Sequence, residues 1–450
     1  MKPGLTLVAL AAMGMLLPAQ TPAPPTLEQV MERLARLENE NRTLREEVRG
    51  LRDEVSALKP ATAEAVPPIQ QLEERMAIQE RRTEEQSQTK VEASQRFPIR
   101  LSGMVLMNAF HNSPASGGAD TPTTAARLLG RQTGGITFRQ SIVGLEYTGS
   151  HTFLGARARG SAFIDFFEGP TENNNFYPVR FRTGGFHLDW ASRTLSFVQD
   201  KPLFSQRDPD SFSFAGVSPL TSSGNLWRWQ PQVRFEQRFG IAGGAIRAKA
   251  QAAMMQTSED SGFDFVTNRF SNERRRPGLQ GRFEIAAGTA GGRRVELAPG
   301  FHVSESNVSG RRYRSDLVSF DWVVSPHPKL VWTGLAWAGQ NVHHFGAFRQ
   351  SFGLVNGVLR PVRSRGGWTQ ASVPITSRFS LNAFGGLHDD RNADLGPAAI
   401  AVNRSGAVNA MFHLAPHIVL SLEAMKQRTT YRDIGNRSNN RYDLSIAYLF

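Results

Sequence analysis

The chain has 450 residues, of which 40% are hydrophobic, 20% are charged and none is cysteine. The lack of cysteine excludes disulfides, thiolate nucleophiles and cysteine-based metal sites. No apolar run of about 18 residues follows the N-terminal segment, so a helical membrane protein is excluded, whereas many short alternating segments are typical of a membrane β-barrel.

The net charge of +12 is unevenly distributed along the chain. Residues 20–96 carry 12 Lys and Arg against 15 Asp and Glu, whereas residues 97–450 carry 39 against 25. In that second part Arg outnumbers Lys by 35 to 4, and the guanidinium fork favours carboxylate and phosphate groups. A basic surface often indicates nucleic-acid binding, but no nucleic-acid partner is expected because the N-terminus predicts export.

Residues 1–19 have the pattern of a signal peptide. Lys2 precedes the apolar run 5–17, and Ala19 supplies a small residue for cleavage. The run is too short to span a bilayer. An exported chain without cysteine is expected in a bacterial envelope.

A heptad repeat over 27–58 predicts a coiled coil of about 48 Å. Ten consecutive seam positions are apolar except Asn41, a polar residue that fixes register. The repeat therefore predicts oligomerisation, with the number of strands left open between dimer and trimer. Its central seam residues are Leu34, Leu37, Asn41, Leu44, Val48 and Leu51.

Prolines at 60, 67 and 68 end the coil. Residues 59–96 are predicted to be a linker with room for one short helix, because Ile69, Leu72 and Met76 follow helical spacing and residues 79–95 are polar.

Residues 97–450 alternate with period 2 and predict an all-β transmembrane antiparallel barrel of about sixteen strands. Residues 152–167, for example, place alanines on one side and arginines on the other. A soluble sandwich would bury the apolar side, whereas a barrel in lipid turns it outward and keeps charge in the lumen.

The expected connections support the strand count. Seven short and eight long ones alternate strictly, as in outer-membrane barrels with short periplasmic turns and longer external loops. Two irregularities are expected: a bulge at Gly184-Gly185, and poor alternation over 313–340. The short connections fall near 149–151, 191–193, 240–243, 288–292, 326–328, 375–377 and 416–417, and the long ones near 111–135, 168–177, 201–225, 257–278, 305–312, 341–366, 389–405 and 429–438.

The final segment, 442–450, alternates large apolar residues and stops at a terminal Phe. This ending resembles the assembly signal of bacterial outer-membrane barrels, in which Tyr448 and Phe450 would engage the barrel-assembly machinery.

Sixteen strands enclose a water-filled channel, and the alternation points a set of cations into it. Each one could simply brace the wall through an ion pair, but the set predicts an anion channel that suits small carboxylates. The set comprises Arg157, Arg159, Arg180, Arg182, Arg234, Arg238, Arg247, Lys249, Arg282 and Arg294, with Asp165, Glu236 and Glu284 among them.

The third long loop, 201–225, is a candidate constriction. In sixteen-stranded porins this loop commonly folds inward, and here Arg207, Asp208 and Asp210 would face the basic wall. An ordinary external loop is the alternative. An acidic constriction would moderate the preference for anions.

These features together resemble the DcaP-like trimeric porins of bacterial outer membranes. Residues 138–147, FRQSIVGLEY, are similar to that family's RQS-x-x-G stretch, and residues 229–235, WQPQVRF, to its RQPQ-x-R-Y stretch. The resemblance implies a homotrimer that takes up small dicarboxylic or aromatic acids, located in the outer membrane with the coil in the periplasm.

The expected function is passive diffusion of small anions, with no cofactor and no metal. Phosphate-selective and general non-specific pores are alternatives, as is an envelope tether with the barrel as anchor. No phosphate-binding, H-E-x-x-H or G-x-S-x-G motif occurs, so no enzyme is expected, although a hydrolase on the barrel exterior would need no local motif. The pair His343-His344 is interpreted as a surface pair in a loop.

Overall fold

The computed structural model describes residues 99–450 except 168–176, 242–244, 257–262, 265–268, 271–272, 275–276, 290, 309–310 and 348. The predicted signal peptide, the coiled coil at 27–58 and the linker at 59–96 lie outside the described residues. None of the described helices is long and apolar enough to cross a membrane.

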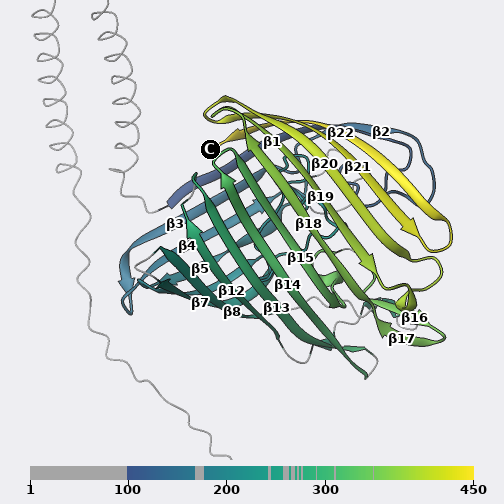
Figure 1. The fold of residues 1–450 in the computed structure, drawn as a ribbon, viewed down its shortest axis with the longest axis horizontal. Helices are drawn as coiled ribbons and strands as arrows, with labels where there is room; N and C mark the ends of the chain where they lie inside the picture. Colours follow the sequence, from purple (N-terminus) through teal and green to yellow (C-terminus); the bar gives the residue numbers. More distant parts are fainter. Residues whose placement is uncertain are drawn as a thin grey trace, which may run out of the picture. The chain divides into compact units, whose positions relative to one another are not determined.

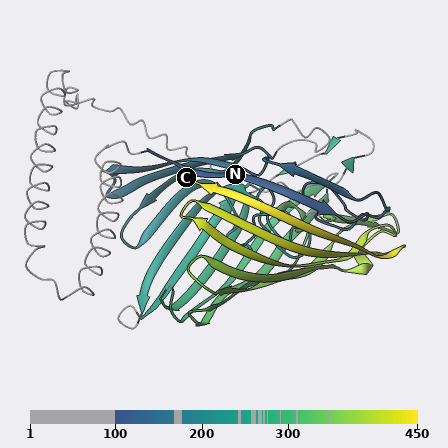
Figure 2. The same ribbon diagram turned by 90° about the horizontal axis from the view of Figure 1, so that it is seen from above.

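Sixteen antiparallel strands form a closed barrel (Figure 1). Each strand pairs with the next, and β1 pairs with β22 from Met104↔Leu449 to Asn112↔Arg441, which closes the sheet. Figure 2 shows β1 and β22 side by side at this seam. The strands are β1 (Ile99–Asn112), β2 with β3 (Thr133–Thr137 and Ile142–Phe153, both paired with β1), β4 (Ala156–Asp165), β5 (Arg180–Asp189), β6 (Arg193–Asp200), β7 (Gln230–Ile241), β8 (Ile246–Met255), β12 (Gly278–Gly288), β13 (Arg294–Val308), β14 (Arg311–His327), β15 (Leu330–Gln340), β18 (Arg363–Pro374), β19 (Phe379–Asp390), β20 (Ile400–Ala415), β21 (Ile418–Tyr431) and β22 (Gly435–Leu449).

Short elements lie in the connections. They are β9 (Phe263–Asp264), β10 (Arg269–Phe270), β11 (Glu273–Arg274), β16 (Phe352–Val355), β17 (Val358–Pro361) and the single 3₁₀ turns η3 (His343–Phe345) and η4 (Asn392–Asp394). All are on the side of the barrel opposite the seven short turns. We call this side the long-loop end and the other the short-turn end.

Two of the eight connections predicted to be long are short. Strand β13 ends at Val308 and β14 begins at Arg311, while β21 ends at Tyr431 and β22 begins at Gly435. In both hairpins the polar residues assigned to loops continue the strands. A strand needs an apolar face only where it meets hydrocarbon, so polarity alone does not end it.

The predicted irregularity in β5 is present, but two residues earlier than Gly184-Gly185. Phe163 pairs with Thr183 and Ile164 pairs with Phe181, which leaves Arg182 as the extra residue. A bulge of this kind re-aims side chains on the bulged strand. Here it brings Arg180 and Arg182 to the same carboxylate on β4.

Candidate functional site: the barrel lumen

The strands present apolar side chains outward and polar ones inward. Phe235 on β7 is 45% exposed on the outer face, while its neighbour Arg234 has a side chain only 12% exposed and bonded to Asp200 inside. On β22 the outward positions include Tyr442, Leu444, Ile446 and Tyr448, and these side chains are exposed, as is that of Phe450 just after the strand. This inverts the pattern of a soluble protein and is that of a membrane barrel.

Inside the barrel, β8, β12, β13 and β14 contribute an ion-pair network. Arg282 bonds Asp321 (Nε to Oδ2, 2.8 Å) and Glu284 (Nη2 to Oε2, 2.7 Å). Lys249 reaches Glu284 at 3.3 Å, and Arg294 reaches Glu296 at 3.3 Å. Arg282 and Asp321 each have a side chain only 1% exposed, so this part of the network is desolvated and held by charge-assisted hydrogen bonds.

Arg207, from the third loop, completes this network. Its guanidinium donates to Asp321 (Nε to Oδ1, 2.9 Å) and Glu296 (Nη2 to Oε2, 2.8 Å), and it lies 3.6 Å from Glu284. The predicted basic wall is therefore acidic where Arg207 meets it. The four cations and three carboxylates of the network bind the loop to the barrel.

A second ionic group lies on β4 and β5 near the long-loop end. The fully buried carboxylate of Asp165 accepts from Arg180 and Arg182, each at 2.6 Å. Both guanidinium groups also lie over the ring of Trp229, at 5.1 and 4.4 Å from its centroid. One carboxylate for two arginines leaves this group with a positive excess.

Four of the remaining predicted cations lie toward the short-turn end, among them Arg159, which bonds Asp189, and Arg238, which bonds Glu236 at 2.7 Å. Arg234 instead bonds Asp200 at 3.0 Å, where β6 enters the third loop. Arg157 and Arg247, each the second residue of its strand, have no carboxylate partner among the described residues; Arg247 donates to the carbonyl of Gly288. The ten predicted cations thus share seven carboxylates. The sequence alternation had predicted only three of these to face the lumen.

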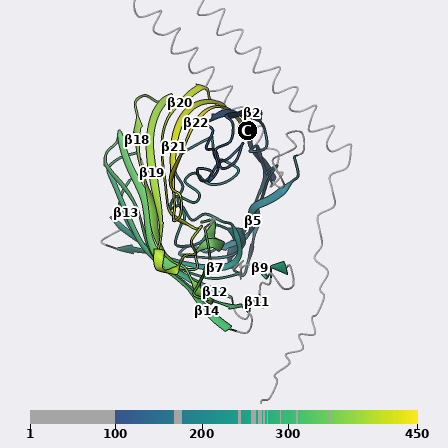
Figure 3. The same cartoon turned by 90° about the vertical axis from the view of Figure 1, so that its right-hand side faces the viewer.

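The third loop, 201–229, crosses the lumen. Leu203 lies inside the barrel, where its backbone N–H donates to the side chain of Gln280 on β12. Further along, the side chain of Ser211 donates to Glu423 on β21, and the carbonyl of Ala215 accepts from Arg182 on β5. Figure 3 shows segments without regular structure inside the ring of strands. The loop is fixed to walls on several sides of the barrel.

The two acidic residues of the loop are occupied by other partners. Asp208 pairs with Lys201 of the same loop and accepts from the Asn225 amide at 3.0 Å. Burial alone would raise the pKa of Asp208, but Lys201 and these hydrogen bonds hold it below the ordinary value. Asp210 bonds Gln370 on β18 through its backbone N–H at 2.7 Å and through its carboxylate at 2.5 Å.

An apolar core inside the barrel holds the loop in place, and the sequence interpretation missed it. Phe204, Leu220 and Trp227 from the loop pack with inward-facing residues of the wall, among them Leu335 and Trp337 on β15. The indole N–H of Trp337 donates to the carbonyl of Gly224 at 2.7 Å. The poor alternation over 313–340 was the available signal, because it reflects apolar residues on the inner face.

Other loops add to this core, and one prediction there was wrong. His344 is not a surface residue: it is fully buried, 5.8 Å from the His302 ring and 3.9 Å from the Phe345 ring, measured between centroids. The described residues contain no group of three metal-ligating side chains. His344 thus belongs to the packing beneath the loop.

The fold resembles two solved structures over nearly their whole length. The outer membrane channel DcaP of Acinetobacter baumannii superposes with a TM-score of 0.64 at 16% identity, covering 78% of this chain and 97% of that chain. The chain has the porin fold. An anion-selective porin from Comamonas acidovorans superposes with a TM-score of 0.53 at 12% identity, covering 78% and 99%. No family model and no curated protein matches the sequence.

Proposed function

We propose that this porin-fold chain carries small anionic solutes, with carboxylates as the main class, by passive diffusion across a bacterial outer membrane. The observation that carries the proposal is that the ten predicted lumen cations outnumber the carboxylates that pair with them. Ten predicted cations share seven carboxylates. A net positive tube attracts anions and repels cations.

The cations would act at two levels. Arg157 and Arg247 would attract anions at the short-turn end, where neither forms an ion pair with a described carboxylate; Asp189, opposite Arg157 on β5, bonds Arg159 instead. Arg180 and Arg182, deeper in the lumen, share Asp165 and present guanidinium groups beside Trp229. A planar guanidinium binds a carboxylate through two parallel hydrogen bonds, so the deeper pair would favour carboxylates over halide.

The third loop would act as a fixed constriction. Its ion pairs to the wall and its apolar core leave Asp208 and Asp210 bonded to neighbours. Those carboxylates would therefore reduce the preference for anions only modestly.

The remaining expectations belong to the same proposal. The chain would form a homotrimer through a periplasmic coiled coil at 27–58, and β22 would present Tyr448 and Phe450 to the barrel-assembly machinery. The alternation on β22 and the outward exposure of both residues support the second point.

The test is a reversal-potential measurement in a KCl gradient with the protein in a planar bilayer. We expect a potential of the sign that reports chloride flux. The double variant Arg157→Gln/Arg247→Gln should lower the anion-to-cation permeability ratio about two-fold or more, since both charges are unpaired. Arg314→Gln, which removes an exposed arginine on the outer face, is the control and should leave the ratio unchanged.

Cation preference in the unmodified protein would overturn the proposal. A panel of carboxylates and phosphate in the same bilayer separates a carboxylate pore from a phosphate-selective or general one. Absence of any current would favour the alternative of a structural tether whose barrel is only an anchor.

A further inference from the structure

Three cations stand on the outer face of the barrel, near the long-loop end. Arg404 lies on β20, and Lys426 and Arg428 lie on β21; all three side chains are exposed. Arg404 and Arg428 are direct cross-strand partners, and Lys426 is the partner of Gly406. Their neighbours on the strand are buried, for example Asn403 and Gln427, so the alternation directs these cations away from the lumen.

The three cations lack counter-charges. No carboxylate among the described residues pairs with any of them, whereas the exposed outer-face arginines Arg314 and Arg365 pair with Asp316 and Asp389. Like charges directly opposite each other on adjacent strands are destabilising. An arrangement of this kind is relieved when an anion binds between the charges.

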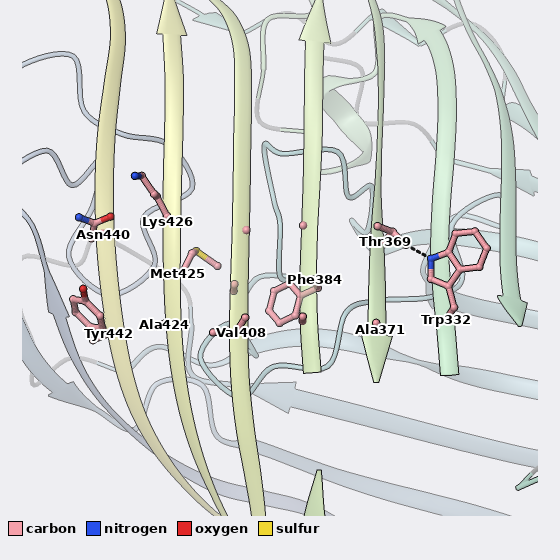
Figure 4. A pocket seen from close by; sticks show the side chains of 14 residues that line it. Trp332, Thr369, Ala371, Phe384, Val408, Ala424, Met425, Lys426, Asn440 and Tyr442 are labelled. Atoms are coloured by element: carbon pink, nitrogen blue, oxygen red, sulfur yellow. Dashed lines mark hydrogen bonds between the residues drawn. The ribbon is translucent and has the colours of Figure 1, made fainter. Parts of the chain in front are cut away.

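A groove crosses the outer face from β15 to β22, transverse to the strands and directly beside these cations. It has a volume of about 620 Å³ and is lined by small residues of β18 to β21, with Lys426 on its edge toward the long-loop end and Trp332 and Tyr442 at its two ends. Figure 4 shows Trp332 and Tyr442 on strands at opposite edges of the groove. The lining includes Ala371, Ala383, Gly385, Gly406, Val408 and Ala424.

The geometry points to a binding site for a lipid with a phosphorylated headgroup. The phosphate would bond Arg404, Lys426 and Arg428, and one acyl chain would lie in the groove. Arginine forks match phosphate oxygens, and the apolar lining suits a hydrocarbon chain. The site is on the face that meets lipid in the proposed orientation, at the height of the external leaflet. The proposed lipid site depends on the barrel being in a membrane, but it does not depend on the barrel conducting ions.

The experiment measures lipid retained by the purified full-length protein. The protein in detergent is titrated with diphosphoryl lipid A, and bound lipid is counted by native mass spectrometry. We expect Arg404→Gln/Arg428→Gln to weaken binding at least ten-fold. The matched control, Arg312→Gln/Arg314→Gln, removes two exposed arginines from the outer face of β14 and should change binding less than two-fold.

Two further arms separate the headgroup from the groove. Gly406→Leu fills the groove from an outward position where an added side chain meets only ordinary contacts, so it should weaken lipid binding and leave the cations in place. Inorganic phosphate should compete only at far higher concentration than lipid, because it lacks the acyl chain. The gel mobility of unheated samples confirms that each variant is folded.

Several outcomes would overturn the inference. Equal loss in the β20–β21 variant and in the β14 control would indicate general electrostatic attraction. Equal affinity for a lipid without phosphate would remove the role of the cations. Lipid that binds only the monomer, never the oligomer, would show that a second copy of the chain covers the groove. Channel current does not enter these readouts, so the proposed transport function stands or falls separately.

Discussion

Arg207 connects the third loop to three wall carboxylates, on β12, β13 and β14. Replacing it by Met would leave Asp321, Glu296 and Glu284 without their loop partner, and all three are largely buried. Arg282, Lys249 and Arg294 would still pair with these carboxylates. Because two charge-assisted hydrogen bonds from Arg207 in a largely desolvated network would be lost, we expect a loss of about 3 kcal/mol in the free energy of unfolding. Urea unfolding in lipid vesicles measures it.

The control for this variant is Arg365→Met. Arg365 has a side chain 76% exposed and one carboxylate partner, so the expected loss is about 0–1 kcal/mol. Arg207→Met should also shift the permeability ratio toward cations. Equal stability of the two variants would contradict a structural role for Arg207.

The partners of the lumen cations were only partly predictable. Alternation along a strand gave the inward direction of Arg282, but its partner Asp321 lies 39 residues away on β14. Pairing across strands depends on register, which period-2 patterns do not specify to the residue. Arg207 could not be assigned to Glu296 and Asp321 because a loop has no periodicity to direct its side chains.

At the scale of elements, the tip of the third loop depends on Gly224. Its φ of +104° lies in the left-handed region, and a Cβ there would overlap the carbonyl oxygens of Gly367 and Leu387. Gly224→Ala should therefore displace the loop from Trp337 and cost more than about 1 kcal/mol. We expect a larger and noisier single-channel conductance.

Gly396→Ala provides the comparison. Gly396 lies in the connection between β19 and β20, and a Cβ there would meet nothing within 4 Å. This variant should keep both the conductance and the stability of the unmodified protein. An unchanged conductance in Gly224→Ala would show that the loop does not set the size of the passage.

Sixteen strands were predictable because alternation and turn signals repeat along the whole barrel. The connection between β13 and β14 was predicted to be a long loop because the strand ends that flank it are polar on both faces. The inward apolar residues of β15, Leu335 and Trp337, broke the alternation for a reason in the tertiary structure: they contact a loop distant in sequence. Single-sequence patterns do not contain that contact.

For the whole molecule, the proposed coil and barrel have separable tasks. Deleting 27–58 should weaken the trimer, because the heptad seam with Asn41 would be lost. The conductance of each barrel should remain, since its closure depends on β1 and β22. Cross-linking measures the oligomer and bilayer recording measures the current per barrel.

A deletion variant that remains as strongly trimeric as the full chain would show that the barrels alone hold the assembly. A variant with reduced current per barrel would contradict independent tasks.

The molecule has a second apolar region, which lies inside the barrel wall and includes Phe204, Leu220, Trp227, Leu335 and Trp337. Detergent that replaces bilayer around the outside does not touch it, so extraction should preserve the docked loop. Solutes small enough to pass the mouth reach it directly. The third loop can therefore detach from the wall while the sixteen strands remain paired. The channel would then become leaky before the barrel unfolds.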